Sequence, residues 1–414
     1  MTSTRRWLVA TTEYAGLTPY TGGIGRGFAS LLPALVRAGV EVDLVVLSCD
    51  PPLDGFDPEG VRILEYVRLR RRPAIGRLLQ RALHLRALVR RTRYDAIFLA
   101  EWEGLGALLP RHAPLVTNLA TGYRIADWIA GGSARGRTLR TRLLIGLQKR
   151  LETRQMRRSR GLVPISRAVR DWYSTRIPEL PPSVVVRNCI DVPTVQRSAR
   201  SGDLPDGWPP GPGPVVLFLS RIERRKGVET AVHAFEALAR TRPDVSFVFA
   251  GAFCFLEPTE AELLGMVADE HRERFTFLGH VGGDEVFAAI RAATVVTCPS
   301  RWEGFGNAAL EVKAVGTPLV ATTGSGFDDF CEDGVDALMV PRDDRSALSE
   351  AIGRLLDEPE LRERLTDRAA RGIHAFTADA VAPDLLAAAQ QLLEGNGRAI
   401  GGAIGGAMAS SEHR

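Results

Sequence analysis

Lysine and cysteine are scarce in this chain, and long apolar runs are absent. Of the 53 basic residues among 414, 50 are arginines and the other three are Lys149, Lys226 and Lys313. The bias toward arginine is typical of a GC-rich genome. A lysine kept against that bias indicates a position that needs a compact ammonium.

The five cysteines are scattered, and none form a CxxC pair: Cys49, Cys189, Cys254, Cys298 and Cys331. This argues against a disulfide framework or a zinc knuckle and favours a reducing compartment. The apolar run Trp7–Ala10 is too short for the core of a signal peptide, and the sequence has no stretch of about 18 apolar residues. We therefore expect a cytoplasmic protein.

The chain has the composition of a globular protein, with 45% hydrophobic and 25% charged residues. Its charge is unevenly spread. Residues 1–200 hold 33 basic and 16 acidic residues, a balance of +17, whereas residues 201–414 hold 20 and 33, a balance of −13. We expect the two halves to meet different partners.

Apolar runs alternate with helix-period stretches in both halves, which predicts an α/β fold with parallel sheets. The predicted strands are 6–12, 40–47, 94–100, 114–119 and 161–165, then 215–219, 245–250, 275–278, 294–297 and 318–321. The predicted helices are 26–38, 75–91 and 138–158, then 227–241, 284–291, 307–315, 345–356 and 379–394. In the segment 201–214, nine of fourteen residues are glycine or proline, which is typical of a linker.

These patterns predict two Rossmann-like domains that face each other across a cleft. The predicted boundaries are 1–195 for the first domain, 196–214 for the linker, 215–372 for the second domain, 373–394 for a C-terminal helix, and 395–414 for a flexible tail rich in glycine, alanine and serine.

The sharpest motif is the segment 300–311, which follows a predicted strand and enters a helix. Gly304 and Gly306 permit a tight turn and a close approach of the backbone to a ligand. The first N–H groups of a helix have no intrahelical partner, so this terminus predicts a phosphate site. Glu303 precedes the helix and Glu311 lies about one turn inside it. Their spacing favours binding to different parts of one long ligand.

A basic turn follows the first predicted strand of the second half. In this turn Arg221 supplies a planar fork of N–H donors, and Lys226 supplies a compact ammonium. A diphosphate would use both kinds of group. The alternative is a solvated basic turn.

A glycine-rich turn opens the first predicted helix. Its glycines permit a close approach to an anion. A dinucleotide fingerprint needs G-x-G-x-x-G, but here Gly23, Gly25 and Gly27 alternate, and Phe28 stands where a glycine is required. Nicotinamide binding is therefore disfavoured.

Taken in order, these segments resemble the family 4 glycosyltransferases, which have the GT-B fold. The resemblance runs from about residue 6 to about residue 390. Its most specific part is Glu303 to Glu311, which is similar to the family's E-x7-E signature. The segment 188–191 resembles the family's N-G-V-D segment, and residues from Phe376 onward resemble the C-terminal helix that crosses back to the first domain.

The resemblance implies transfer of a sugar, with retention at the anomeric carbon, from a nucleoside diphosphate sugar. This donor is a co-substrate, and neither a metal nor a further cofactor is expected. Arg221 and Lys226 would hold the diphosphate, and Glu311 the ribose hydroxyls. Glu303 would bind hydroxyls of the donor sugar. Glu303, Arg221 and Lys226 are the catalytic residues in this prediction.

The rest of the donor site follows from the same resemblance. The phosphate cradle would be completed by backbone N–H groups of Phe305, Gly306 and Asn307, with Gly23 closing it from the first domain. The pocket for the base is placed near the loops 252–256 and 279–282, with His280 and Val281 in its lining. Neither residue type separates uracil from guanine.

The sequence departs from the family pattern on the acceptor side. Many members carry a histidine at the end of the strand predicted at 114–119, and none stands there. Asn118 and Asp127 are the acceptor-side candidates instead. Cys189 stands where the family often has glycine. Which group would take the acceptor proton is left open.

Two arginine-rich stretches, 68–93 and 135–160, dominate the first half. The second has nine arginines and Lys149 against a single acid, Glu152, with leucines at helical spacing between them. A basic amphipathic helix can lie on an anionic membrane, where each basic residue contributes about 1 kcal/mol. We predict peripheral contact with the inner face of the cell membrane. The alternative is that the leucines pack on the sheet. No recognition motif indicates nucleic acid.

The sequence thus predicts a retaining, metal-independent enzyme that moves a hexose-type sugar to a glycan or lipid-linked acceptor. The expected setting is bacterial surface polysaccharide or glycolipid synthesis. Two alternatives stay open: a GT-B-shaped nucleotide-binding scaffold without catalysis, prompted by the missing histidine, and a nicotinamide oxidoreductase. The nucleotide base, the sugar, the acceptor, the linkage and the oligomeric state are encoded in no motif.

Overall fold

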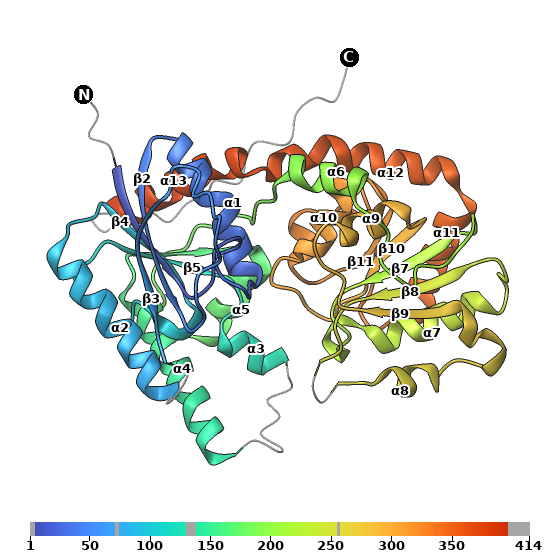
Figure 1. Ribbon diagram of the computed structural model, residues 1–414, viewed down its shortest axis with the longest axis horizontal. Helices are drawn as coiled ribbons and strands as arrows, with labels where there is room; N and C mark the ends of the chain where they lie inside the picture. The colour runs from blue at the N-terminus through green and yellow to red at the C-terminus, as the bar shows by residue number, and fades with distance from the viewer. Residues whose placement is uncertain (1–4, 71–73, 130–137, 255–256, 396–414) are drawn as a thin grey trace.

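The computed structural model describes residues 5–70, 74–129, 138–254 and 257–395. It shows two α/β domains side by side (Figure 1), each built on a six-stranded parallel sheet.

The first sheet has the strand order β3-β2-β1-β4-β5-β6, with every neighbouring pair parallel. Its strands are β1 (Arg5–Thr11), β2 (Val40–Ser48), β3 (Arg62–Arg68), β4 (Ala96–Ala100), β5 (Leu115–Leu119) and β6 (Gly161–Pro164). The helices of this domain are α1 (Gly23–Arg37), α2 (Ala74–Arg91), α3 (Tyr123–Ile129), α4 (Leu139–Arg158) and α5 (Arg167–Arg176).

The second sheet has the order β12-β11-β10-β7-β8-β9, also all parallel. Its strands are β7 (Val215–Leu219), β8 (Ser246–Ala250), β9 (Phe275–Gly279), β10 (Val295–Cys298), β11 (Leu319–Thr322) and β12 (Leu338–Val340). Its helices are α6 (Val192–Ser201), α7 (Val228–Ala239), α8 (Glu260–Leu264), α9 (Glu285–Ala292), α10 (Asn307–Val315), α11 (Arg345–Asp357) and α12 (Pro359–Gly372).

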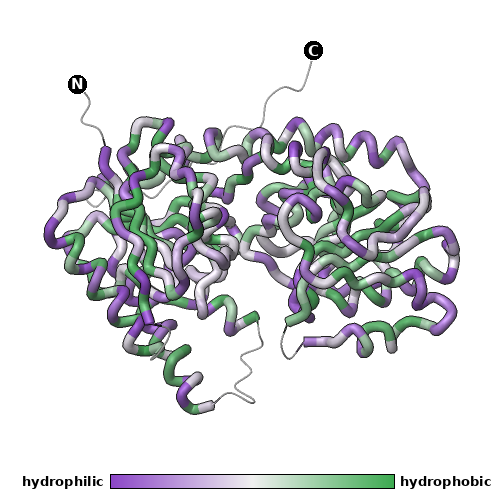
Figure 2. The backbone as a smooth tube through the Cα atoms, in the orientation of Figure 1, coloured by the Kyte–Doolittle hydropathy of each residue, from purple (hydrophilic) through white to green (hydrophobic). Residues whose placement is uncertain are grey.

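The central strands are continuous apolar runs because helices cover both faces of each sheet. Every residue of β4 and of β7 is buried. Figure 2 shows the hydrophobic chain running through the middle of each domain and hydrophilic segments on the helices outside.

Both sheets reverse their strand order at one point, between β1 and β4 in the first domain and between β7 and β10 in the second. Open α/β sheets bind ligands beyond the carboxyl ends of the strands at such a point. The loops that follow these four strands are therefore the expected walls of a site.

The last helix, α13 (Ala378–Glu394), returns to the first domain and packs against α1 (Figure 1). The chain passes between the domains twice, and the two passages lie side by side. The backbone N–H of Ile190 donates to the carbonyl of Phe376 at 2.8 Å, and Asp191 caps α6 beside it. The predicted crossing helix is confirmed.

Each predicted strand matches an observed one to within two residues. The structure adds β3, β12, α3, α5, α6, α8 and α12. The edge strand β3 has arginines at both ends and only half-buried residues between them, so it lacks the apolar run of a central strand. Helix α12 buries only the narrow stripe Leu361, Leu365 and Ala369.

The predicted linker 196–214 is partly helical. Residues 196–201 belong to α6, which packs against α9 and α10 and so joins the second domain. Of the predicted tail, residues 396–414 lie outside the described chain. In the described ranges, no helix is both long enough and apolar enough to cross a membrane.

Candidate active site

A cavity of about 1720 Å³ lies between the two domains. It is lined by the loops that follow β1, β4, β7 and β10 and by the N-terminal residues of α1 and α10. Ligand pockets commonly measure about 300–1,000 Å³, so this cavity has room for two substrates at once.

Lys226 and Glu303 meet in this cavity although 77 residues separate them. The contact depends on Gly227, which has φ of +75° and whose added Cβ would lie 2.0 Å from the carbonyl oxygen of Pro299. Only glycine lets the loops after β7 and β10 approach so closely. The Lys226 ammonium then bonds to the Glu303 carboxylate, which also accepts a hydrogen bond from Ser300 Oγ at 2.8 Å.

This cluster keeps Glu303 ionised. Burial alone would raise the pKa of Glu303, but the charges of Lys226 and Arg225 and the hydrogen bonds from Lys226 and Ser300 outweigh it, and the pKa lies below its usual value. Burial lowers the pKa of Lys226, and the charge of Glu303 opposes this effect. An ammonium has three N–H donors, so Lys226 can bond to Glu303 and to a phosphate oxygen together.

Arg221 also lines the cavity, with its side chain 57% exposed. Its guanidinium lies 2.9 Å from Oε1 of Glu223, and Arg225 contacts the same oxygen at 2.6 Å. The two predicted cations are thus brought to one wall, where acids of the same loops balance them.

The N-terminus of α10 opens into the cavity beside this cluster. Gly306 caps the helix with φ of +103°, and an added Cβ would lie 2.2 Å from the ring of Phe327. Phe305, Gly306 and Asn307 all line the cavity. The ring of Phe305 packs against the ring of Phe330, with centroids 4.8 Å apart. Unpaired N–H groups and the helix dipole favour an anion at this position.

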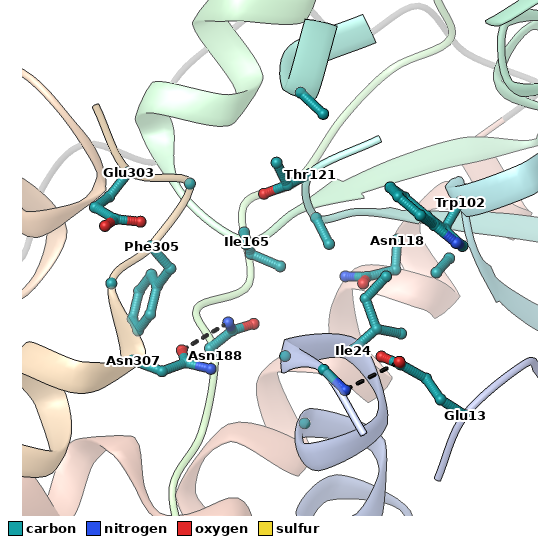
Figure 3. A pocket seen from close by; sticks show the side chains of 18 of the residues that line it. Glu13, Ile24, Trp102, Asn118, Thr121, Ile165, Asn188, Glu303, Phe305 and Asn307 are labelled. Atoms are coloured by element: carbon teal, nitrogen blue, oxygen red, sulfur yellow. Dashed lines mark hydrogen bonds between the residues drawn. The ribbon is translucent and has the colours of Figure 1, made fainter. Parts of the chain in front are cut away.

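Gly23 faces this terminus from the first domain. A Cβ at Gly23 would lie 3.9 Å from the side-chain nitrogen of Asn307, and Asn188 donates to the Asn307 side-chain oxygen at 3.1 Å (Figure 3). The N-termini of α1 and α10 therefore converge on the same space.

Glu13 is a site residue that the sequence analysis missed. Its carboxylate accepts hydrogen bonds from the backbone N–H groups of Gly22 and Gly25, each at 3.0 Å, and it lines the cavity (Figure 3). It fixes the glycine turn by occupying part of its anion-binding backbone. An acid directly after the first strand and before a glycine turn was the available signal.

Glu311 lies beside the cavity and is not in its lining. It sits one turn into α10, 3.9 Å from Arg26 of α1. Burial raises the pKa of Glu311 to about 7, against the charge of Arg26. Its carboxylate therefore changes charge near neutral pH.

Three other predicted residues also lie outside the cavity lining. His280 is exposed in the loop after β9, and Val281 packs against the core. Asp127 on α3 is held by Lys149 of α4. Asn118, at the end of β5, does line the cavity, and its side-chain nitrogen donates to the carbonyl of Val163 at 3.1 Å.

Trp102 and Glu103 were also missed, and both line the cavity at the end of β4. Figure 3 shows Trp102 and Asn118 across the space from Glu303 and Phe305. The signal was an acidic and aromatic segment directly after a fully buried strand. In the described ranges, this cavity included, no group of three or more His, Cys, Asp or Glu side chains is placed to hold a metal ion.

Two family models match the chain. The model described as Glycosyltransferase Family 4 matches residues 21–193, and the model described as Glycosyl transferases group 1 matches residues 207–372. These two segments correspond to the two walls of the cavity.

Characterised proteins are similar over most of the chain. A glycogen synthase of Mycobacterium tuberculosis is 28% identical over 400 residues, which is 88% of this chain and 89% of the relative. A D-inositol 3-phosphate glycosyltransferase of Paenarthrobacter aurescens is 28% identical over 386 residues, 86% of this chain and 89% of the relative. The solved structure of a sucrose-phosphate synthase from Thermosynechococcus elongatus has a TM-score of 0.73 at 20% identity and covers 95% of this chain and 100% of its own.

Proposed function

The chain belongs to the family 4 glycosyltransferases, enzymes with the GT-B fold, and from this premise we propose that it transfers a hexose-type sugar from a nucleoside diphosphate sugar to a glycan or a lipid-linked acceptor. The two similar enzymes differ in the acceptors that their names state or imply. The chemical class of the acceptor therefore depends on residues particular to this chain.

The observation that carries the proposal is the meeting of Lys226, Glu303 and the α10 N-terminus at the reversal point of the second sheet. A departing nucleoside diphosphate gains negative charge as the bond to the sugar breaks. Fixed N–H donors and cations aimed at that charge are the strongest source of rate enhancement in such sites. Arg221 and Lys226 supply the cations, and Glu303 supplies an acceptor for donor-sugar hydroxyls.

Retention at the anomeric carbon and independence of metal are further parts of the proposal. Both rest on the family pattern. Proton NMR of the first product formed would give its anomeric configuration. Activity that persists in excess EDTA would support catalysis without a metal, and loss of activity with recovery on adding Mg²⁺ or Mn²⁺ would contradict it.

The proposed workplace is the inner face of the bacterial cell membrane, in synthesis of surface polysaccharide or glycolipid. Helix α2 exposes the stripe Ile75, Leu79 and Leu83, and the first turn of α4 exposes Leu139 and Leu143. Arginines stand beside both groups of apolar side chains, which suits an anionic lipid surface.

In the rest of α4 the leucines pack inside the protein, as in the alternative to membrane contact. Leu144, Leu147 and Leu151 pack with Leu78 and Ala107 inside the domain. The membrane proposal therefore rests on α2 and on the first turn of α4. Residues 71–73 and 135–137 of the two predicted basic stretches lie outside the described chain.

Thermal unfolding with UDP, GDP, ADP, TDP, CMP and NAD in turn tests the donor site. A ligand at about 100 times its Kd should stabilise the native state by roughly 2.7 kcal/mol. We expect a shift with at least one nucleoside diphosphate. Lys226→Ala, compared with its own ligand-free midpoint, should lose the shift, and the control Lys149→Ala should keep it because Lys149 contacts only the first domain.

Each other outcome counts against a stated part of the proposal. A shift with NAD alone would favour the oxidoreductase. A shift with a nucleoside diphosphate but no consumption of the corresponding sugar donor, with or without acceptors, would favour the scaffold alternative. No shift with any nucleotide would contradict the donor site itself.

A further inference from the structure

The reversal point of the first sheet forms a second crevice on the same cavity, opposite the wall that carries Arg221, Lys226 and Glu303, here called the donor wall. The loops after β1 and β4 flank it, and they bring Glu13 and the pair Trp102 and Glu103 to the cavity surface. Glu13 is occupied by the glycine turn, so the free chemistry of this crevice is that of the β4 loop.

Glu103 is held in an unusual backbone conformation. Its φ and ψ are +60° and 0°, and it is one of four non-glycine residues with positive φ in the described part of the chain. Gly104 follows with φ of +64°, and an added Cβ there would lie 2.5 Å from the backbone of Leu151 in α4. Left-handed non-glycine residues cost conformational energy and cluster at functional sites. Here the turn places the Glu103 side chain in the cavity lining.

Arg81 fixes the Glu103 carboxylate from α2. Both side chains are almost fully buried and line the cavity, and the Arg81 guanidinium bonds to Oε2 of Glu103. Within the described residues, no hydrogen bond is recorded to the other carboxylate oxygen. Arg81 Nε is buried without a partner in the described chain, so it is closed off from the cavity. The Glu103 carboxylate therefore keeps one open acceptor oxygen in the cavity lining, and Arg81 holds it in place.

Trp102 adds an apolar surface beside this pair. Its indole stacks on the ring of Tyr123 with centroids 4.4 Å apart and an interplanar angle of 22°. The stacked ring is rigid and lines the cavity next to Asn118 (Figure 3). An aromatic surface of this kind packs against the C–H face of a sugar ring, while carboxylate and amide groups bind its hydroxyls.

We infer that Trp102, Glu103 and Arg81 form an acceptor subsite for a neutral polyhydroxylated ring, a sugar or a cyclitol. The Glu103 carboxylate accepts hydrogen bonds from hydroxyls of the ring, Arg81 orients that carboxylate, and Trp102 covers one ring face. An ionised carboxylate or phosphate at the same point has no hydrogen to donate to the Glu103 carboxylate. This inference rests on the proposed transferase function and names the class of acceptor that it uses.

Saturation-transfer NMR with glucose, mannose and myo-inositol as probes tests the subsite, with glucuronate as the anionic comparison. The purified full chain is used, with and without the nucleoside diphosphate that shifts its melting. We expect at least one neutral probe to bind and glucuronate to bind more weakly. Glu103→Gln and Trp102→Ala should each weaken the neutral probe at least about fivefold, a loss of roughly 1 kcal/mol.

Two variants guard against trivial explanations. Glu103→Gln leaves Arg81 buried and unpaired, so the double variant Glu103→Gln with Arg81→Met removes both charges and should show the same loss. Glu65→Gln is the matched control, because Glu65 also pairs with a basic residue of α2, His84, but lies outside the cavity. It should bind the probes as the unchanged protein does.

The inference is overturned if no neutral probe binds, if glucuronate binds more tightly, or if the Glu103 variants retain full affinity. Nucleotide-induced stabilisation, measured on the same samples, should be unchanged in all these variants. Loss of probe binding with nucleotide binding intact concerns this subsite alone. Absence of nucleotide binding in the unchanged protein concerns the proposed function instead.

Discussion

At the scale of residues, the charges of the donor wall largely neutralise one another before any ligand enters. Lys226 and Arg225 face Glu303, while Arg221 and Arg225 face Glu223. A diphosphate must share these cations with the acids that already hold them. Charges fixed in advance need little reorganisation as a leaving group develops charge, and this favours the transition state over the ground state.

Glu311 gives a prediction at this scale, because burial raises its pKa to about 7. If the ionised carboxylate accepts the ribose hydroxyls, affinity for a nucleoside diphosphate sugar should rise with pH and level off above 7. Between pH 6 and pH 7.5 we expect a gain of roughly fivefold to tenfold. A nucleoside diphosphate sugar is the right probe, because its diphosphate is esterified at both ends and lacks the terminal phosphate group that titrates near pH 6.

Isothermal titration calorimetry of the unchanged protein and of Glu311→Gln at both pH values makes the comparison. The variant should bind more weakly and without this pH dependence. An equal slope in both proteins would contradict the role of Glu311. The contribution of Glu311 to folding stability has the opposite pH dependence. Because its pKa is raised, the native state holds this proton more tightly than the unfolded chain does. This contribution to stability is therefore fully present below about pH 4.5 and is lost as pH rises through 7.

At the scale of elements, helix termini and helix faces carry the two kinds of binding. The N-termini of α1 and α10 converge on the cavity, where the N–H groups of α10 and those of α1 that Glu13 leaves free suit a diphosphate. Helix α2 lies on the side of the first domain away from the second domain (Figure 1), and both α2 and α4 expose leucines among arginines. In the proposed function one set of helices serves the donor, and another meets the membrane surface.

Vesicle co-sedimentation tests the membrane prediction for α4. The protein should bind vesicles with about 30% anionic phospholipid and leave neutral phosphatidylcholine vesicles unbound, because arginine charge and apolar side chains act together. Leu139→Gln with Leu143→Gln should weaken binding about tenfold or more, since each leucine loses burial worth about 1.5–3 kcal/mol at most.

The matched control for this pair is Leu53→Gln with Leu204→Gln, which changes two exposed leucines outside α2 and α4. Equal binding to both kinds of vesicle, or equal loss in the control pair, would show that the first turn of α4 is not the contact. In that case its leucines are simply solvent-exposed.

At the scale of the whole molecule, direct contacts between the two domains set the distance between the two walls. Arg167 at the start of α5 donates from its backbone N–H to Asp329 at 2.7 Å and from its side chain to Asp329 and to the Asp328 carbonyl at 2.9 and 2.8 Å. Trp128 meets Trp302 edge to face, with ring centroids 5.7 Å apart. These contacts hold the acceptor and donor walls opposite each other.

Arg167→Ala should loosen this arrangement without touching the cavity. An exposed ion pair is worth up to about 1 kcal/mol, so we expect kcat/KM to fall roughly twofold to fivefold and the radius of gyration of the ligand-free protein to increase in small-angle X-ray scattering. Saturating donor should reverse part of the expansion. Arg170→Ala is the control, because Arg170 pairs with the neighbouring Asp171 of its own helix and with no other acid in the described chain.

Unchanged scattering and unchanged kinetics in Arg167→Ala would mean that the two chain passages, near Ile190 and Phe376, suffice to set the domain orientation. A loss of activity in Arg170→Ala as large as that in Arg167→Ala would point to α5 itself rather than to the contact between domains.

The sequence by itself determined most of the fold and the donor wall. Central strands covered by helices on both faces are apolar throughout, so β7 and β10 could be predicted from the sequence. The loops after these strands, which carry Lys226 and Glu303, could be located in the same way. The E-x7-E spacing and the glycines Gly227 and Gly306 lie within short segments, where local geometry follows from local sequence. The glycosyltransferase assignment was available from these segments alone.

Only the tertiary structure brought together the wall that we propose for the acceptor. Glu13 follows β1, whereas Trp102 and Glu103 follow β4, and their convergence depends on the order of strands in the sheet, which no local pattern encodes. The structure also placed Glu311 beside the cavity, and His280 and Asp127 outside its lining. These positions depend on how two separately folded domains face each other, and that is fixed by contacts between residues far apart in the chain.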